Sequence, residues 1–346
     1  MGSAKKKFEQ LDTLRFVAIF MVLLAHWSNF ASVLAKRYDF GSMGVNLFFV
    51  ISGFLITLGL LGNKESAQPA GKSLYKFYIR RFLRIFPVYY LTIALLWFFY
   101  NEKVADGFWW YVSYLSNFYV IKLQAWGGCG HFWSLAVEEQ FYLVWPFVIL
   151  LLPRKWLAPA ICIAVVSGVG IKYYWWQNHV PFWTPYTHPL GALDVLAMGA
   201  LLAWFYTYKN EALYNLLRHP LFTFFVFSQL LVCIICKNFE YNNIYYHVGI
   251  RASYGLFCAW IIGRTIWGIG GIAGYILNNK FLQYTGKISY GFYLFHPFVP
   301  HMLDWVRLPH GNTKRFVIYF VVTLALSSVS WYLFESKILK LKDRFE

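Results

Sequence analysis

The chain has 346 residues, of which 59% are hydrophobic, 22% are aromatic and only 13% are charged. The charged share is about half that of an ordinary soluble domain. Together with a mean hydropathy of +0.48, this composition excludes a disordered chain, a fibrous repeat and nearly every soluble globular fold. The net charge of +16 would suggest nucleic acid in a soluble protein, but the sequence holds no nucleic-acid motif. We therefore expect a polytopic membrane protein, in which cytoplasmic loops carry an excess of Lys and Arg.

Ten apolar runs have about the length that is needed to cross a bilayer. In chain order they are 14–35, 43–62, 85–100, 132–152, 157–175, 189–207, 221–236, 249–265, 285–303 and 315–334. A further stretch, 108–125, is interrupted by polar residues, and we expect it to lie at the interface or to re-enter the bilayer. The longest predicted loop is 63–84. The fold class predicted is all-α, a polytopic transmembrane helical bundle of about ten spans.

Charge sets the predicted orientation. Ten spans place both termini on one side, and about two thirds of the 31 Lys and Arg residues fall on that side when each is assigned to its nearer end. Both termini are therefore expected in the cytoplasm. The first run follows Lys5–Lys7 and carries Arg15, His26 and Asn29, so we interpret it as a retained span rather than a signal peptide. We expect one transmembrane domain over 1–346 and no separate soluble domain.

The first group of polar residues lies on the first span. Asp12, Arg15 and His26 share one helical stripe, because eleven residues from Arg15 to His26 give a net rotation of only about 20°. The rise between those two residues is about 16 Å, so Arg15 is expected near the cytoplasmic end and His26 well inside the membrane. A structural alternative is that Arg15 is a snorkelling anchor and His26 an interhelical hydrogen-bonding residue.

The second group lies at the expected cytoplasmic mouth of the third span. Arg80, Arg81 and Arg84 precede Pro87, and helical spacing would bring their guanidinium groups close together. Such clusters suit phosphate, because the planar guanidinium binds it through two hydrogen bonds. Ordinary positive-inside anchoring or contact with anionic lipid is the alternative.

The third group enters the fourth span. His131, Ser134, Glu138 and Tyr142 share one helical face, and Glu139 adds a second carboxylate beside an apolar run. Two such carboxylates are costly in a membrane unless they are paired or face water. We favour a functional role, although pairing with an Arg from another span is an alternative.

Smaller signals remain. Asp194 in the sixth run and His296, which precedes a proline in the ninth, are polar residues within spans, and Glu335 ends the tenth. Gly44 and Gly53 in the second run are expected to mark close helix packing. Cys233 and Cys236 form a CxxC, but they lie in an apolar run with no second ligand pair nearby, so we interpret them as apolar core residues.

Taken together, these segments resemble the integral-membrane acyltransferase-3 family. The matching stretches are Leu11-Asp-Thr-Leu-Arg-Phe-Val-Ala18 leading to His26, Gly44-Val-Asn-Leu-Phe-Phe-Val-Ile-Ser-Gly-Phe-Leu-Ile56, Arg80-Arg-Phe-Leu-Arg-Ile-Phe-Pro-Val-Tyr89, His131-Phe-Trp-Ser-Leu-Ala-Val-Glu-Glu-Gln-Phe-Tyr142 and Ile288-Ser-Tyr-Gly-Phe-Tyr-Leu-Phe-His-Pro297. They occur in the family's order. One departure is Ser336 after Glu335, where relatives usually have Pro, which bears on how sharply the last span ends.

The resemblance implies transfer of an acyl group, most often acetyl from cytoplasmic acetyl-CoA, to a hydroxyl of a carbohydrate or glycolipid at the outer face. It implies a bacterial-type cytoplasmic (inner) membrane as the location, a coenzyme A thioester as the donor, and no metal. The family residues treated as essential match His26 and Arg81 with Arg84, and Arg80 is adjacent.

The residues support a mechanism of that kind. We expect Arg80, Arg81 and Arg84, with Arg15, to bind the phosphates of the donor. A buried His26 would act as a general base or as a transient acyl carrier. Either Glu138 or Glu139 would orient that imidazole if packing brings them together.

We expect the acceptor to be bound by a separate set of side chains on the fourth span. These are His131, Trp133, Ser134 and Tyr142. The acceptor itself stays open among peptidoglycan, other polysaccharides, a lipid-linked sugar and small glycosides, and acyl groups other than acetyl also stay open.

Two other functions fit part of this pattern. A secondary transporter of an anionic solute also needs charged residues within spans, but it predicts an inverted repeat that the order of hydrophobic runs does not show. A membrane protein that binds a glycolipid without chemistry would retain the aromatic residues, yet it has no need of His26 together with the arginines.

Overall fold

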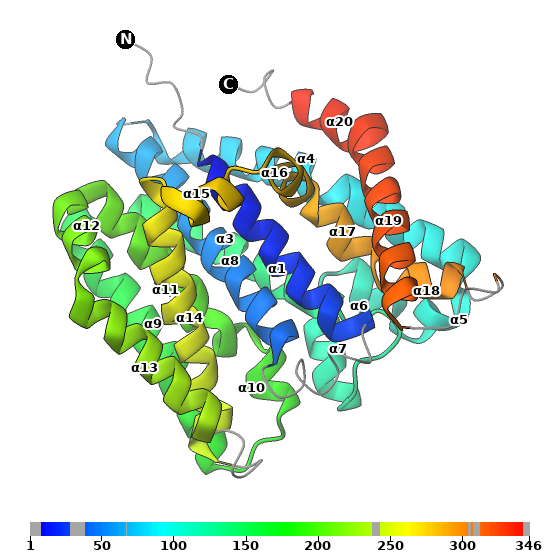
Figure 1. The fold of residues 1–346 in the computed structure, drawn as a ribbon, viewed down its shortest axis with the longest axis horizontal. Coiled ribbons are helices and arrows are strands. Elements are labelled where there is room, and N and C mark those ends of the chain that lie inside the picture. The colour runs from blue at the N-terminus through cyan, green and yellow to red at the C-terminus, as the bar shows by residue number, and fades with distance from the viewer. Residues whose placement is uncertain are drawn as a thin grey trace.

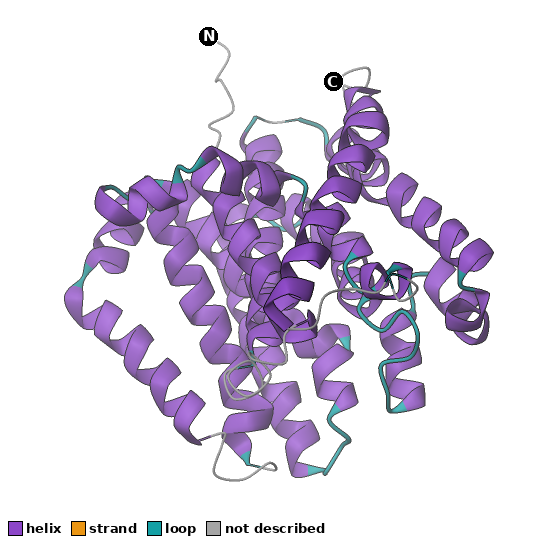
Figure 2. Cartoon of the chain, turned by 45° about the vertical axis from the view of Figure 1, so that its right-hand side comes forward, coloured by secondary structure: helices purple, strands orange, loops and turns teal. Residues whose placement is uncertain are grey.

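The computed structural model describes residues 8–27, 39–66, 68–236, 243–303, 306 and 312–341. Every regular element in this part of the chain is a helix (Figure 2). The predicted all-α class is therefore confirmed. Lys5–Lys7, Asn29 and the last eight residues of the predicted first span lie outside the described residues.

The first half of the chain begins with three long helices and ends with two more. The helices are α1 (Glu9–Trp27), α3 (Phe40–Glu65), α4 (Ala70–Phe99), α5 (Asn101–Val104), η1 (Ala105–Gly107), α6 (Phe108–Val112), α7 (Ser116–Leu123), α8 (Phe132–Leu151) and α9 (Arg154–Gln177). The short elements between α4 and α8 cover the stretch predicted to be interfacial or re-entrant. Neither α6 nor α7 is long enough to cross a membrane.

The second half has more breaks. Its helices are α10 (Trp183–Thr187), α11 (Pro189–Tyr208), α12 (Asn210–Arg218), α13 (Pro220–Cys236), η2 (Tyr245–Gly249), α14 (Ile250–Ile266), α15 (Gly271–Leu277), α16 (Lys280–Lys287), α17 (Ser289–Phe295), α18 (Phe298–Met302), α19 (Asn312–Ser330), η3 (Trp331–Glu335) and α20 (Ser336–Lys340). The helix continues through Ser336, where a proline would have removed a backbone N–H. The last span therefore does not end sharply at Glu335.

The predicted count of ten spans is not confirmed. Seven helices in the described part of the chain are long and apolar enough to cross a membrane, or up to nine if each of two bent pairs is one span. The bent pairs are Asn210–Arg218 with Pro220–Cys236, at 64°, and Tyr245–Ile266 with Gly271–Leu277, at 92°. The predicted run 285–303 is not one helix, because it divides into α17 and α18 at Pro297.

The largest error in the predicted boundaries concerns the third span. The run was expected to begin at residue 85 after a loop of about twenty residues, but α4 already begins at Ala70, directly after Pro69. Proline ahead of a helix favours a start there because its backbone is already fixed. Arg81 and Arg84 therefore lie in the middle of a 30-residue helix, not at its mouth.

Helix α3 is the centre of the bundle, and it packs against α1, α8, α11 and α14 (Figure 1). In its most apolar stretch 72% of the residues are buried, against 11% in the peripheral helix Thr313–Lys340. The start of α1 and the end of α20 lie at the same end of the bundle (Figure 1). Which side of the membrane that end faces stays a prediction.

Glycines allow the central helices to approach closely, as predicted. A Cβ at Gly44 would lie 3.0 Å from the Val22 side chain on α1, and one at Gly53 would meet the backbone of Leu196 on α11. From the opposite side, a Cβ at Gly199 on α11 would lie 2.7 Å from the backbone nitrogen of Phe54. The α3–α11 contact therefore has backbone against backbone, with no room for a methyl group.

We predict that Gly199→Ala lowers the free energy of unfolding by about 1–3 kcal/mol, because the added methyl forces α3 and α11 apart. Gly59→Ala on α3 is the matched control, since nothing lies within 4 Å of the position its Cβ would take. That control should be neutral or stabilising, because Ala favours a helix over Gly. Thermal unfolding of the purified protein in detergent measures both variants, and equal midpoints would contradict the packing described.

Candidate active site

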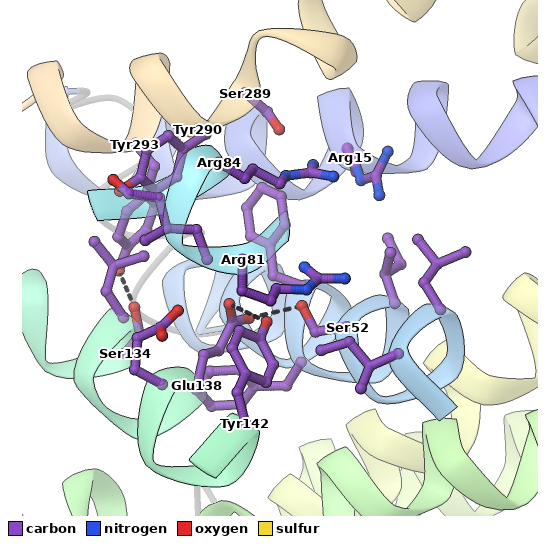
Figure 3. A pocket seen from close by; sticks show the side chains of 18 of the residues that line it. Arg15, Ser52, Arg81, Arg84, Ser134, Glu138, Tyr142, Ser289, Tyr290 and Tyr293 are labelled. Carbon is purple, nitrogen blue, oxygen red and sulfur yellow. Dashed lines mark hydrogen bonds between the residues drawn. The ribbon is translucent and has the colours of Figure 1, made fainter. Parts of the chain in front are cut away.

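Five helices enclose a cavity of about 110 Å³ near the middle of the bundle. Its walls come from α1, α3, α4, α8 and α17 (Figure 3). Its polar lining residues are Arg15, Ser52, Arg81, Arg84, Ser134, Glu138, Glu139, Tyr142, Ser289, Tyr290 and Tyr293. The volume would hold roughly three or four water molecules. All three predicted groups of polar residues thus contribute to one cavity.

Three guanidinium groups gather on one side of this cavity (Figure 3). Arg15 pairs with Asp12 at 2.6 Å, so the predicted stripe on the first span gives a local ion pair. The guanidinium of Arg81 lies over the Tyr142 ring, 5.3 Å from its centroid. Within the described residues, neither Arg81 nor Arg84 forms an ion pair with a carboxylate. Their charge is therefore not neutralised by direct pairing.

Arg80 does not belong to this group. It is not among the residues that line the cavity, although it was predicted to bind the donor with its neighbours. On a helix, Arg80 points about 100° away from Arg81, so only one of two adjacent arginines can face a narrow cavity. Arg15 from α1 supplies the third guanidinium instead.

The two adjacent glutamates have different surroundings. Glu138 accepts hydrogen bonds from the Ser52 hydroxyl at 3.0 Å and from the Tyr142 hydroxyl at 2.9 Å. Both of its oxygens are thereby held in place (Figure 3). Glu139 also lines the cavity, but its Oε1 is buried without a hydrogen-bond partner in the described structure. An unsatisfied buried oxygen is costly, so Glu139 is the carboxylate that is open to a bound molecule.

Tyr293 closes the cavity at the α17 side. Its hydroxyl donates to the backbone carbonyl of His131 at 2.9 Å and lies 2.6 Å from the Ser134 Oγ. The Ser134 hydroxyl also lies 3.4 Å from this carbonyl, so the two hydroxyls and the carbonyl form one hydrogen-bonded group in which the carbonyl only accepts. The predicted face of α8 is thus tied to α17 by a residue that was not predicted to take part.

His26 does not line this cavity, and its predicted carboxylate partner is wrong. The Nδ1 of His26 lies 2.8 Å from the Nε2 of His296, and neither glutamate is its hydrogen-bond partner. The two imidazole rings are stacked with centroids 4.9 Å apart. His26 lies in the last turn of α1, and its burial within the membrane stays a prediction.

A chain of hydrogen bonds assigns the protons of the two histidines. The Nδ1 of His296 lies 2.8 Å from the carbonyl oxygen of Tyr293, so this nitrogen must donate. With both rings neutral, the Nε2 of His296 must then accept, and the Nδ1 of His26 must donate to it. The Nε2 of His26 is left with a free lone pair, as a general base requires.

The proline of this segment explains why the Tyr293 carbonyl is available. In a continuous helix that oxygen would accept from the backbone N–H four residues later. That residue is Pro297, which has no N–H. The side chain of His296 takes the vacant position, so the break between α17 and α18 creates the hydrogen bond that orients His296.

Two further residues of the predicted acceptor site, His131 and Trp133, lie in different places. The ring of His131 lies 5.5 Å from that of His296, so His131 is close to the histidine pair. Trp133 does not line the cavity and packs instead against Phe49 and Tyr186, with ring centroids 5.9 and 5.1 Å apart. Trp133 therefore does not share the cavity with Ser134, and its predicted role in acceptor binding stays a prediction.

Sequence reasoning missed three residues of this region. Ser52 lies in the run Gly44–Gly53, which was read only as a packing segment, although its hydroxyl was a signal. Tyr290 and Tyr293 lie in the stretch Ile288–Pro297, but tyrosine is too common in this chain to be selected without knowledge of which helix faces which. The spacing of Ser52 and Tyr293 from Glu138 gives no indication that they meet.

Asp194 has a structural explanation. It accepts from the ammonium of Lys172 at 2.6 Å, and the two side chains are 0% and 1% exposed. This ion pair joins α9 to α11. The polar residue predicted as a functional candidate in the sixth run is therefore accounted for by a buried partner.

Comparison with known proteins agrees with the resemblance seen in the sequence. The family model described as an acyltransferase domain matches residues 8–333. The chain is 30% identical over 377 aligned positions to the peptidoglycan O-acetyltransferase OatA of Listeria monocytogenes, an alignment that covers 97% of this chain and 56% of the relative. It is 25% identical over 367 positions to the O-acetyltransferase OatA of Staphylococcus aureus, covering 95% of this chain and 57% of that one.

The chain thus spans about half the length of the curated relatives it matches. No solved structure matches it. The similarity to the two OatA proteins extends over nearly all of this chain, so the cavity and the histidine pair both lie within the matched region.

We predict that Asp194→Asn lowers the free energy of unfolding by about 3–5 kcal/mol, because it leaves the Lys172 charge buried without a partner. The double variant Lys172→Met/Asp194→Leu should recover most of this loss, since apolar residues can replace a buried ion pair. As a control, Glu9→Gln breaks the exposed pair with Lys280 and should cost less than about 1 kcal/mol. Chemical denaturation in detergent measures all three, and equal losses for the two single variants would contradict this.

Proposed function

The chain belongs to the acyltransferase-3 family, and on that basis we propose that it is a membrane-embedded O-acyltransferase of the bacterial cytoplasmic membrane. It moves an acyl group, in the simplest case acetyl, from acetyl-CoA to a hydroxyl of a carbohydrate or glycolipid. Residues 8–333 form the transmembrane domain that does this. The observation that carries the proposal is the lone pair on His26 Nε2, fixed by His296 and the Tyr293 carbonyl.

Three arginines suit the donor. Coenzyme A carries several phosphate charges, and guanidinium groups bind phosphate through paired, charge-assisted hydrogen bonds. Arg81 and Arg84 have no ion-pair partner among the described carboxylates, so their charge is available to a ligand. A cavity of about 110 Å³ is too small for the whole coenzyme, because drug-sized ligands occupy roughly 300–1,000 Å³. It fits the thin thioester arm with the pyrophosphate at its head beside Arg81 and Arg84, and the adenosine lies outside.

The acyl step requires a base. The hydroxyl oxygen of the acceptor attacks the thioester carbonyl while its proton passes to His26 Nε2, and the carbon–sulfur bond breaks to release the coenzyme A thiolate. The same proton then returns from the imidazolium to the thiolate. In the two-step form, His26 Nε2 attacks the thioester first and expels the coenzyme A thiolate. The acceptor hydroxyl then takes the acyl group from the imidazole, and the hydroxyl proton goes to the thiolate.

Tyr293 links the two halves of this site. Its hydroxyl lines the cavity with the arginines, and its carbonyl orients His296. The thioester must therefore pass the Tyr293 and Ser134 hydroxyls to reach His26. A hydrogen bond between two hydroxyls is weak enough to open for this passage, since its net contribution is about 1 kcal/mol.

The acceptor we propose is a peptidoglycan-type glycan. The relative from Listeria monocytogenes is named a peptidoglycan O-acetyltransferase, and this chain is similar to it over nearly its whole length. The acceptor approaches from the end of the bundle at which α1 ends, where His26 lies.

The first prediction from this mechanism concerns the donor. Arg84→Ala should raise the KM for acetyl-CoA about 10- to 100-fold, because a charge-assisted hydrogen bond to phosphate contributes about 1.5–3 kcal/mol. Lys72→Ala is the matched control, as Lys72 is an exposed cation on the same helix that does not line the cavity. Initial rates with labelled acetyl-CoA and soluble glycan strands measure this. An equal change in both variants would indicate a general electrostatic effect and contradict a phosphate site at Arg84.

The second prediction concerns the histidine pair. His26→Ala should lower kcat by at least about 100-fold, since it removes the base. His296→Ala should lower kcat by about 10- to 100-fold through loss of the correct tautomer, by analogy with oriented metal-bound histidines. His296→Gln should recover part of the loss, because its amide oxygen can accept from the His26 Nδ1–H.

The same labelled transfer assay reads out these variants, with the thermal midpoint in detergent as the check on folding. Full transfer by His26→Ala would show that another residue is the base. Wild-type kcat in a folded His296→Ala variant would show that the histidine pair does not set the tautomer of His26.

A further inference from the structure

A continuous band of aromatic rings runs along the end of the bundle opposite to the start of α1. From Trp126 it passes to Trp133, at 6.5 Å between ring centroids, and then to Tyr186 at 5.1 Å. It continues to Phe182 at 4.9 Å and to Tyr246 at 5.8 Å. These five residues, which we call the aromatic track, come from the loop before α8, from α8, from the α10 region and from η2.

The far end of the track opens into two adjoining hollows. The larger, of about 460 Å³, is lined by Trp176, His179, Val180, Pro181, Phe182, Tyr246 and His247. The smaller is lined by Phe182, Tyr246 and His247 again, together with polar residues that include Asp39, Ser42 and Arg251. The shared residues make the two hollows one site, with aromatic faces on one part and polar groups on another.

Arg251 holds the middle of the track in position. It is 6% exposed and donates through Nε to the Asn46 side chain and through Nη1 to the carbonyls of Pro185 and Tyr186. Its guanidinium carbon lies within 6 Å of the ring centroids of Trp133 and Tyr186. A buried cation fixed in this way ties α14 to the α10 region, so the rings that it contacts are preorganised.

Three aromatic residues at the far end of the track differ from an ordinary interfacial belt. Belt residues face outward, as Tyr173 and Tyr174 of α9 do with 46% and 59% of their surface exposed. Phe182, Tyr186 and Tyr246 are instead half-buried and pack against one another around a hollow. Rings that surround a hollow beside Asp39, Ser42 and Arg251 suit a ligand with apolar faces and polar edges, which describes a sugar ring.

The track is linked to the proposed catalytic centre through the chain at the start of α8. Trp126 and Trp133 flank His131 in the sequence, and the His131 ring lies 5.5 Å from that of His296, the partner of His26. A molecule that reaches both His26 and the hollows must therefore be extended. A glycan strand of several sugars is such a molecule.

We propose that the aromatic track and its two hollows are a remote binding site for the acceptor glycan strand. The strand presents one hydroxyl to His26 while a distant sugar stacks on Phe182 and Tyr246. This inference rests on the proposed function, and it adds where the acceptor binds and that the enzyme prefers long strands over short ones. Binding energy from the remote sugars holds the reacting hydroxyl in place.

The test measures binding separately from transfer. The probes are fluorescently labelled, peptide-free peptidoglycan glycan strands of about two and about eight sugars, because only the longer strand carries many sugars remote from the reacting hydroxyl. Their dissociation constants are measured by fluorescence anisotropy on the full chain in detergent. We expect wild type to bind the long strand more tightly than the short one.

Variants in the track should remove that preference. Phe182→Ala, and Phe182→Leu as a more conservative change, should each weaken binding of the long strand about tenfold, as expected for loss of one stacked ring. Binding of the short strand should not change. Tyr275→Ala is the matched control, because Tyr275 is an 82% exposed aromatic residue on α15 at the other end of the bundle.

The outcomes separate the two proposals. If folded Phe182→Ala and Phe182→Leu bind the long strand as tightly as wild type, or if wild type does not distinguish the strands, the remote site is wrong. If the track variants weaken binding as expected but wild type transfers no acetyl to either strand, the remote site stands and the proposed catalytic function fails.

Discussion

Charge inside hydrocarbon is the constraint on which this structure depends. A charged or polar side chain within a membrane-spanning helix must find a partner or a wet cavity, because hydrocarbon offers it none. Lys172 and Asp194 satisfy this requirement with each other. Arg81 and Arg84 satisfy it by facing a cavity between helices. The same requirement thus gives a rigid cross-link in one half of the bundle and an electropositive space in the other.

The donor and acceptor sides of the proposed reaction meet at one residue. Tyr293 presents its hydroxyl to the cavity that holds the arginines and its carbonyl to the histidine pair. A displacement of Tyr293 at the cavity would therefore also move the carbonyl that orients His296. In the proposed reaction, separation of the two compartments by a few side chains would keep water away from the thioester.

Much of the fold followed from simple patterns in the chain, and the limits of those patterns are specific. Hydropathy located the long helices, because a continuous run of apolar residues is a strong signal. It failed at α4, where polar residues such as Lys72 and Arg80 hid fifteen residues of helix before the predicted start. It failed again at Pro297, where an apolar run concealed a break.

Part of the candidate site could also be predicted from the sequence. Spacing along a helix identified Ser134, Glu138 and Tyr142 as one face, and clustering identified Arg81 and Arg84. Contacts between helices could not be read in this way, because one sequence carries no record of which faces meet. His26 was therefore given a glutamate partner when its partner is His296, and Ser52 was taken as a packing residue when it binds Glu138.

The dipeptide His296–Pro297 acts as a unit. Pro297 leaves the Tyr293 carbonyl without its usual backbone donor, and the imidazole of His296 donates a hydrogen bond to it instead. An alanine at 297 would provide a backbone N–H that competes for the Tyr293 carbonyl. The helical hydrogen bond would form, and the His296 imidazole would lose the bond that orients it. The loss of Pro297, which carries no reactive group, would then alter the chemistry of His26 through the Tyr293 carbonyl and His296, which is 270 positions from His26 along the chain.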